Sequence, residues 1–260
     1  MEDDETTIRI NELDLNTIPP LTDKMFDHDH GGPKLVVIGK PGTGKTTLIE
    51  AVIHSKSHII PCGVAMSGTE DSNGFYSRIF PDTFIYNRLE ESKVEDFIKR
   101  QKLAKKHLKN PWGLLLIDDC TDDPKIFTKP LFQGLFKNGR HWKTMFILSL
   151  QYCMDIRPVI RNSIDGTFIL RETNLKSRRA LWENYAGCIP DFSTFCDIMD
   201  GITGDHTALF INNMIDTGNW QDRIFWYKAD PNKSSGLKLG CQDYWDFHTS
   251  RFDPRSTEAI

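Results

Sequence analysis

The chain has 260 residues, 39% of them hydrophobic, and carries a formal net charge of −4 with a pI near 6.1. This length suits one large α/β domain, or a domain with extensions. The acidic balance does not indicate a nucleic-acid-binding protein by itself, although a local basic lining would be enough for one. No apolar run approaches membrane-spanning length and no signal peptide precedes the acidic start, so we expect no membrane insertion.

The metal-ligating residue types are scattered along the chain. None of the six cysteines forms a C-x-x-C pair, which argues against a zinc site and favours free thiols in a reducing compartment. They are Cys62, Cys120, Cys153, Cys188, Cys196 and Cys241. His28 and His30 lie close together, but the spacing lacks further ligands, so we interpret this stretch as a solvated loop.

Residues 1–31 form an acidic leader, and the stretch after it carries the strongest motif of the chain. Leu35–Ile38 is a short apolar run typical of a buried strand, and Gly39–Thr46 then fits the pattern G-x-x-x-x-G-K-[ST]. Glycines let the backbone wrap a phosphate closely, and the N-terminus of the following helix adds N–H donors. The expected nucleotide-binding residues are Gly39, Lys40, Pro41, Gly42, Thr43, Gly44, Lys45, Thr46 and Thr47.

Two side chains of this loop have predicted chemical roles. Lys45 is expected to reach the β- and γ-phosphates of ATP, and the Thr46 hydroxyl is expected to ligate Mg²⁺.

The middle of the chain is expected to alternate strands and helices. A second strand is predicted over 57–64, a polar loop over 66–76 and a short strand over 83–86. A helix over 91–109 buries Val94 and Phe97, while its other face is basic. That face fits either a DNA-backbone contact or a solvated helix surface. Its basic residues are Lys99, Arg100, Lys102, Lys105, Lys106 and Lys109.

Residues 112–119 form the second motif of the predicted nucleotide-binding site. An apolar strand ends in Asp118 and Asp119, as expected for the Walker B element that accompanies a phosphate loop. Asp118 would hold the water shell of Mg²⁺ beside Thr46. Asp119 would orient or deprotonate the attacking water.

The remainder continues the alternation. We predict a helix over 125–138, a strand over 144–149 that leads to Gln151, and a strand over 166–170. Helices follow over 175–185 and 191–199, and strands over 207–211 and 223–227 form a possible hairpin. This order predicts an α/β fold, a mainly parallel sheet with helices on both faces and the ligand at the carboxyl edge of the strands. We place an ATPase domain at 32–229 and a surface extension at 230–260.

The order of these motifs resembles the genome-packaging ATPases of large DNA viruses. The resemblance is carried by Gly39–Thr46, Asp118-Asp119, Arg140 within Gly-Arg-His-Trp, Gln151 and Arg161. These ATPases are poxvirus-type members of the FtsK–HerA superfamily of DNA pumps. The resemblance covers about residues 32–172. It implies a RecA-like P-loop NTPase core with an extra strand between the phosphate-loop strand and the Walker B strand.

The resemblance also implies a function and roles for further residues. It implies an ATP- and Mg²⁺-dependent homo-oligomeric ring that moves double-stranded DNA into a capsid, with capsid or portal components as partners, at the virion or the assembly site in the host cytoplasm. Gln151 matches the sensor, and Arg140 matches the arginine finger given to a neighbouring subunit, with Arg161 as a second candidate. Asp119 falls where many relatives carry Glu, and its shorter side chain requires a closer water.

Two other functions are compatible with a phosphate loop. A small-molecule kinase would need an arginine-bearing lid, for which residues 171–186 offer Arg171, Lys176, Arg178 and Arg179. A nucleotide-dependent switch would need no catalytic acid, and the two acids at the end of the Walker B strand argue against it.

Overall fold

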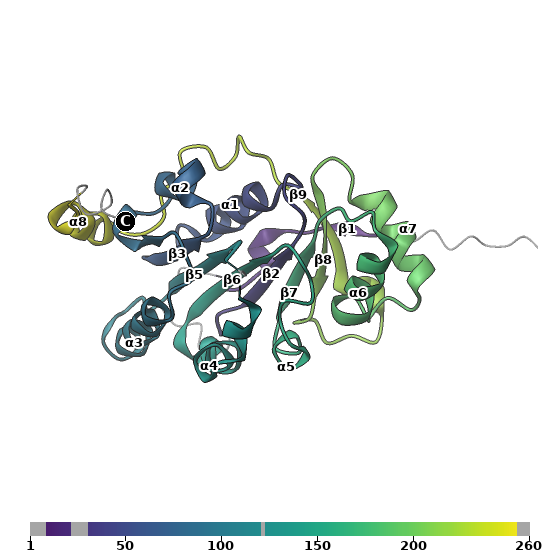
Figure 1. Cartoon of the computed structure of the whole chain (residues 1–260), viewed down its shortest axis with the longest axis horizontal. Coiled ribbons are helices and arrows are strands. Elements are labelled where there is room, and N and C mark those ends of the chain that lie inside the picture. The colour runs from purple at the N-terminus through teal and green to yellow at the C-terminus, as the bar shows by residue number, and fades with distance from the viewer. Residues whose placement is uncertain (1–8, 22–30, 121–122, 254–260) are drawn as a thin grey trace, which may run out of the picture.

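The computed structural model describes residues 9–21, 31–120 and 123–253. In this part of the chain nine strands form one sheet in the order β1-β9-β8-β7-β2-β6-β5-β3-β4 (Figure 1). The strands are β1 (Asn11–Glu12), β2 (Lys34–Ile38), β3 (Gly63–Ser67), β4 (Ile85–Tyr86), β5 (Gly113–Asp118), β6 (Thr144–Leu150), β7 (Gly166–Ile169), β8 (Thr207–Asn212) and β9 (Ile224–Lys228). Neighbours pair in parallel except β7 with β8 and β8 with β9.

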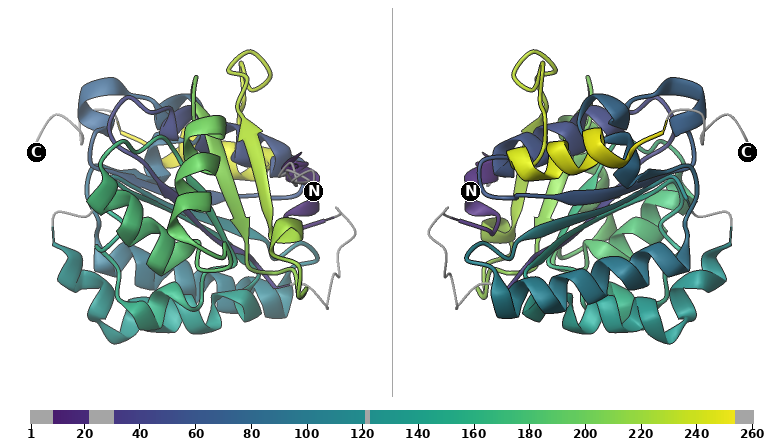
Figure 2. Two further views of the ribbon diagram at one scale, coloured as in Figure 1. Left: turned by 90° about the vertical axis from the view of Figure 1, so that its right-hand side faces the viewer. Right: turned by 90° about the vertical axis from the view of Figure 1, so that its left-hand side faces the viewer.

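Helices cover both faces of the sheet. In Figure 1, α1 and α2 lie on one side of the sheet and α3, α4 and α5 lie on the other, and Figure 2 shows the same layers from two further sides. Helices α6 and α7 contribute to the same core as α3, α4 and α5. The helices are α1 (Lys45–Lys56), α2 (Glu70–Asn73), α3 (Glu91–His107), α4 (Pro130–Asn138), α5 (Pro158–Arg161), α6 (Leu175–Tyr185), α7 (Phe192–Ile202) and α8 (Gln242–Arg251). Across the described ranges, no helix has the length and apolar character needed to cross a membrane.

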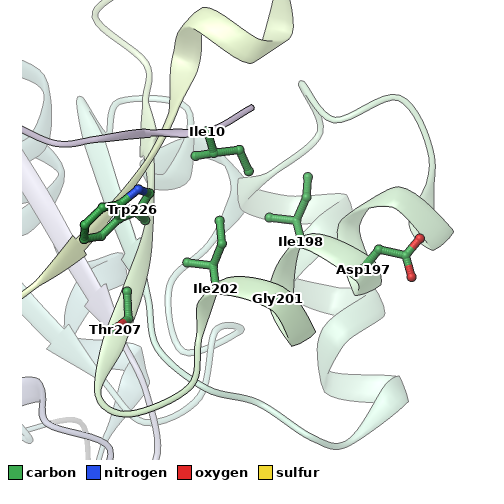
Figure 3. Close-up of a pocket in the computed structure, with 7 residues that line it drawn as sticks. All are labelled: Ile10, Asp197, Ile198, Gly201, Ile202, Thr207 and Trp226. Atoms are coloured by element: carbon green, nitrogen blue, oxygen red, sulfur yellow. The ribbon is translucent and has the colours of Figure 1, made fainter. Parts of the chain in front are cut away.

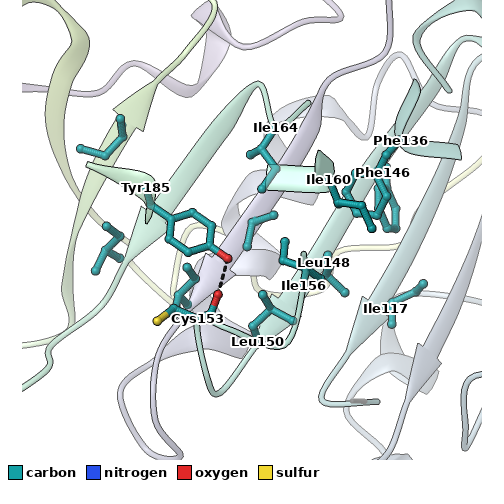
Figure 4. Close-up of a cluster of buried hydrophobic side chains, with 14 of the residues drawn as sticks. Ile117, Phe136, Phe146, Leu148, Leu150, Cys153, Ile156, Ile160, Ile164 and Tyr185 are labelled. Atoms are coloured by element: carbon teal, nitrogen blue, oxygen red, sulfur yellow. Dashed lines mark hydrogen bonds between the residues drawn. The ribbon is translucent and has the colours of Figure 1, made fainter. Parts of the chain in front are cut away.

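The central strands are apolar on both faces because each face is covered, as expected for parallel strands. Their side chains alternate: Val36 and Ile38 of β2 join the core under α3 to α7, whereas Leu35 and Val37 join the core under α1. Figure 4 shows the first core, where the Tyr185 hydroxyl donates to the Cys153 carbonyl at 2.5 Å. These two layers confirm the predicted α/β fold with a mainly parallel sheet and helices on both faces.

The strand order also confirms the expected extra strand. Strand β6 lies between β2, which leads into the phosphate loop, and β5, which carries the two acids. Their register places Ile38 beside Leu150, and Ile117 beside Leu148. The carboxyl ends of β2, β5 and β6 therefore meet at one edge of the sheet.

Parts of both expected extensions belong to the packed domain. Strand β1 pairs with β9, and the following turn buries Leu13 and Ile18 against α1, so the leader is not separate from the domain over these residues. The C-terminal extension contains α8, which we did not predict. Tyr244 of α8 donates to the Gly63 carbonyl at 2.6 Å and stacks on Phe84, so the helix covers the β3–β4 end of the sheet.

Two predicted elements between these ends were wrong. Residues 57–60 form the turn that ends α1, because the amides of Ile59 and Ile60 donate to the Lys56 carbonyl, and the strand begins only at Gly63. The helix predicted over 125–138 is divided into a 3₁₀ turn, Pro124–Thr128, and α4. Lys129 between them is extended, as expected for a residue before proline.

Smaller differences concern element boundaries. Helix α3 ends at His107, β4 is limited to two residues, and the loop expected over 66–76 contains α2. The late hairpin is confirmed, although residues 213–223 form a longer connection than the predicted turn.

Candidate nucleotide site

The phosphate loop has the backbone that its glycines predict. Gly42 and Gly44 have φ angles of +77° and +99°, a region that L side chains rarely adopt, and α1 begins at the next residue, Lys45. The loop therefore turns sharply from the end of β2 into the helix, and the free N–H groups of the first helical turn face the same edge.

Lys45 lies between the loop and the second acid of β5. Its Nζ donates to the Gly39 carbonyl at 2.9 Å and lies 3.4 Å from Asp119 Oδ1, with only 6% of the side chain exposed. The structure thus brings together the lysine and the acid that the sequence placed in separate motifs.

The two acids at the end of β5 differ in environment. Asp118 is buried, and its Oδ2 accepts a 2.8 Å hydrogen bond from the Tyr76 hydroxyl, a contact that no motif predicted. Burial raises the pKa of Asp118; the hydroxyls of Ser149 and Tyr76 oppose this shift, and the Asp119 carboxylate reinforces it. Asp119 has a φ of +49°, which Asp tolerates better than most residues, and this turn directs it toward Lys45.

The donor set fits a magnesium ion. Asp118 Oδ1 is buried and accepts no hydrogen bond among the described residues, although the Ser149 hydroxyl lies near the carboxylate, so it has an oxygen available of the kind that Mg²⁺ prefers. The described ranges contain no cluster of three His, Cys, Asp or Glu side chains that could hold a metal. A metal here would therefore take most of its ligands from phosphates and water, as Mg²⁺ in nucleotide sites does.

Gln151 lies at the same edge. It directly follows Leu150, whose carbonyl accepts the Gly39 amide at 3.1 Å, and its own side chain is exposed. The bond from Tyr185 to Cys153 fastens the segment just after Gln151 to α6. Gln151 is thus held level with the start of the phosphate loop.

Three residues at this edge carried no sequence signal. Tyr76 reaches Asp118 from the loop after β3. Glu172, just after β7, accepts a hydrogen bond from Lys40 of the phosphate loop at 2.6 Å. Burial would raise the pKa of Glu172, but the bonds from Lys40 and from the Asn174 amide hold it below its ordinary value. The imidazole of His206, which precedes β8, packs beside Gly44.

The turn that carries His206 is strained. Asp205 and His206 have consecutive positive φ angles of 49° and 60°, and Lys228 pairs with Asp205 across the hairpin. A Cβ at Gly44 would lie 3.2 Å from His206 Nδ1. The histidine therefore limits the space on this flank of the loop.

We expect Gly44→Ala to lower the free energy of unfolding by roughly 1–2 kcal/mol. Alanine is strained in the left-handed conformation that Gly44 adopts, and its Cβ would also crowd the His206 ring. Gly134→Ala is the matched control, since a Cβ there meets no atom within 4 Å in the middle of α4. That change should stabilise the protein by roughly 0.5–1 kcal/mol. Urea denaturation measures the free energy of unfolding of both variants. Equal denaturation midpoints for the two variants would contradict the left-handed conformation assigned to Gly44.

A separate hollow of about 530 Å³ lies on the other face of the sheet. Ile10, Ile198, Ile202 and Trp226 line it, together with Thr207, the residue after His206 (Figure 3). Ile198 belongs to the core under α3 to α7, whereas α1 contributes to the opposite core. This hollow is therefore separate from the candidate nucleotide site at the phosphate loop.

Arg140 lies at the opposite edge of the sheet, whereas Arg161 lies at the end of α5, on the connection from β6 to β7, with its guanidinium 3.2 Å from the Met154 sulfur. Both line a cavity of about 890 Å³ that also contains Lys34, at the start of β2. Arg140 donates to Asp165, which also accepts from the Lys34 ammonium at 2.7 Å. The Arg140 side chain is 53% exposed, whereas Arg161 is buried with its guanidinium over the Tyr185 ring.

The two edges are separated by the length of β2. Five residues at about 3.3 Å each give roughly 16 Å between Lys34 and the start of the phosphate loop. Arg140 therefore cannot reach the phosphates bound by its own subunit without refolding the sheet. A role for it at a phosphate requires a second subunit.

The sequence also suggested a histidine pair and a basic helix face as candidate binding residues. His28 and His30 lie outside the described residues. On the basic face of α3, Lys99 pairs with Glu95 and Asp96, and Lys102 lies over the Trp142 ring at 5.0 Å. Lys105 and Lys106 are exposed.

Comparison with known proteins identifies viral relatives and a shared fold. No family model matches the chain. It is 46% identical over 243 residues to protein 088R of Invertebrate iridescent virus 3, covering 93% of each chain. It is 48% identical over 248 residues to protein 075L of Invertebrate iridescent virus 6, covering 95% of each chain.

The genome packaging NTPase B204 from Sulfolobus turreted icosahedral virus 2, solved in complex with AMPPCP, superposes with a TM-score of 0.56 at 16% identity. The match covers 76% of this chain and 98% of B204, and confirms the fold implied by the resemblance. The chain therefore belongs to the family of large-DNA-virus proteins that includes 088R and 075L, and it has the P-loop fold of viral genome-packaging NTPases.

Proposed function

We propose that this protein is an ATP-hydrolysing motor that moves double-stranded viral DNA into the capsid. The observation that carries the proposal is the division of the expected catalytic groups between two edges of one sheet. Lys45, Asp118, Asp119 and Gln151 lie at one edge, and the exposed Arg140 lies at the other. A chain arranged in this way completes its site when copies associate front to back, and a closed ring of such copies can enclose DNA.

Each residue at the carboxyl edge has a distinct role in this proposal. The loop amides and Lys45 bind the triphosphate and compensate charge that develops on it. Thr46 and Asp118 would hold Mg²⁺, which would neutralise charge on the phosphates. Asp119 is the base that orients the attacking water, and Gln151 contacts that water and the γ-phosphate.

The arrangement of α6 argues against the kinase alternative. Arg178 is buried, donates to the Glu172 carbonyl and pairs with Asp200 of α7. Arg179 packs over the Phe192 ring at 4.2 Å. The segment that a kinase would use as a lid thus contains a helix fastened to its neighbour, and Arg178 and Arg179 have structural partners.

The partners and place of action follow from the proposed activity. Duplex DNA is the substrate that is moved, and the exposed lysines of α3 are candidate backbone contacts. Capsid or portal components would anchor the ring, at the virion or at the assembly site in the host cytoplasm.

The two acids of β5 should separate binding from hydrolysis. We expect Asp119→Asn to bind Mg-ATP normally but to lose turnover by roughly 10²–10⁴-fold, because it keeps the size and removes the base. Asp118→Asn should also weaken Mg²⁺-dependent nucleotide binding. Fluorescent-nucleotide titration and phosphate release measure the two effects. Normal turnover by Asp119→Asn would place the catalytic carboxylate elsewhere.

One assay distinguishes the candidate functions. Phosphate release from ATP is measured with and without duplex DNA, alongside a screen of phosphoryl acceptors. The proposal predicts phosphate release that DNA stimulates, with no labelled acceptor. Transfer to a small molecule would establish a kinase, and nucleotide binding without turnover would establish a switch.

A further inference from the structure

Tyr76 is a polar residue enclosed in the core beside the expected metal site. It is 1% exposed and belongs to the 3₁₀ turn Tyr76–Arg78, in the segment between β3 and β4. Its hydroxyl donates to Asp118 Oδ2 at 2.8 Å. The phenol O–H is the donor of this bond, and the carboxylate oxygen is its acceptor.

The position of Tyr76 is fixed from two sides. The buried carboxylate of Glu70 accepts the amides of Tyr76 and Ser77 at 3.0 and 2.9 Å. The phenol ring packs edge-on against Phe75 and Phe80, with ring centroids 5.1 and 6.2 Å away. A phenol held by its backbone and by its ring has little freedom to follow a carboxylate that rotates.

The hydrogen bond assigns different tasks to the two oxygens of Asp118. Oδ2 accepts from Tyr76, while Oδ1 is buried and accepts no hydrogen bond from the described residues, although the Ser149 hydroxyl lies near the carboxylate. A carboxylate held by one oxygen presents the other in a defined direction. Outer contacts of this kind orient a metal-binding carboxylate and contribute to metal affinity.

We propose that Tyr76, held by Glu70, is a positioning residue that orients Asp118 toward the magnesium ion of bound nucleotide. This inference rests on the proposed function, because it concerns the metal of the same site. It assigns a task to the segment after β3 that no motif in the sequence indicates.

The test compares Tyr76→Phe with Tyr244→Phe. Both changes remove a buried hydroxyl and keep the ring, but Tyr244 donates to the Gly63 carbonyl, outside the candidate site. Binding of a fluorescent ATP analogue is titrated with Mg²⁺ and repeated in EDTA, and thermal melting checks folding. We expect Tyr76→Phe to need about 10-fold or more Mg²⁺ for half-maximal binding, with unchanged binding in EDTA. Tyr244→Phe should match the wild type.

A second variant tests the role of Glu70. Glu70→Gln keeps the side-chain shape but replaces one acceptor oxygen with an NH₂ donor, so the amide of Tyr76 or of Ser77 loses its acceptor. The Mg²⁺ midpoint should therefore rise in the same direction by a smaller factor. If the wild type depends on Mg²⁺ and Tyr76→Phe has the same midpoint, the positioning role is refuted and the ATPase proposal stands. If nucleotide binding by the wild type is independent of Mg²⁺, the proposed Mg²⁺-dependent ATPase function is itself refuted, and the role of Tyr76 is refuted with it.

Discussion

Lys45→Ala is expected to lower ATP turnover by roughly 10²–10³-fold or more, the loss typical of a charge-stabilising donor at a reacting centre. Lys45 is nearly enclosed, but its contacts in the structure are the Gly39 carbonyl and Asp119, both of them parts of the site. Its removal therefore takes a cation from the phosphates without opening either hydrophobic core. Phosphate release at saturating Mg-ATP measures the effect.

Lys233→Ala is the control for the loss of one lysine. Lys233 is exposed in the C-terminal extension, and its removal should leave turnover unchanged. Circular dichroism should give similar melting curves for both variants and the wild type. Turnover by Lys45→Ala near the wild-type rate would show that the phosphate-loop assignment is wrong.

Arg140→Ala is expected to bind ATP normally and to hydrolyse it about 10³–10⁵-fold more slowly, the range reported for arginine fingers. The guanidinium is half exposed and held by Asp165 at the edge opposite the phosphate loop. In a ring it would face the γ-phosphate of the adjacent subunit. Mixing Arg140→Ala with Lys45→Ala subunits should restore part of the activity, because some interfaces then combine an intact arginine with an intact lysine.

The mixing experiment needs two controls. Labelled subunits must be shown to exchange between rings, and Arg88→Ala, which removes an exposed arginine, should leave turnover unchanged. A lack of rescue despite proven exchange would remove Arg140 as a finger in trans. Arg161 would then be the next residue to test, although its position over the Tyr185 ring leaves it less free to reach a neighbour.

The central sheet and the phosphate loop could be predicted because their signals are local. A buried parallel strand appears as an uninterrupted apolar run, and the glycines of residues 39–44 specify a turn that few sequences permit. Asp118 and Asp119 could be assigned because an acid at the end of such a strand must emerge at the same edge as the loop. The order of motifs, compared with a known family, added the position of β6.

Residues that act through distant contacts could not be predicted. Tyr76 lies 42 positions from Asp118, and Lys40 lies 132 positions from Glu172, so no spacing rule joins them. The apolar residues Ile59 and Ile60 suggested a strand, but both are buried in the turn that closes α1. Helix α8 lacked a clear hydrophobic period because Tyr244 is the one side chain that it buries among its described residues.

We propose that ATP hydrolysis moves the protein along duplex DNA, and displacement of a triplex-forming strand tests this movement. A third strand is annealed to one end of a linear duplex, and its release is followed after addition of protein and ATP. We predict release that requires ATP and Mg²⁺, is delayed on longer duplexes and is absent with Lys45→Ala. Rapid ATP hydrolysis with no release above the Lys45→Ala background, on duplexes of any length, would contradict DNA translocation.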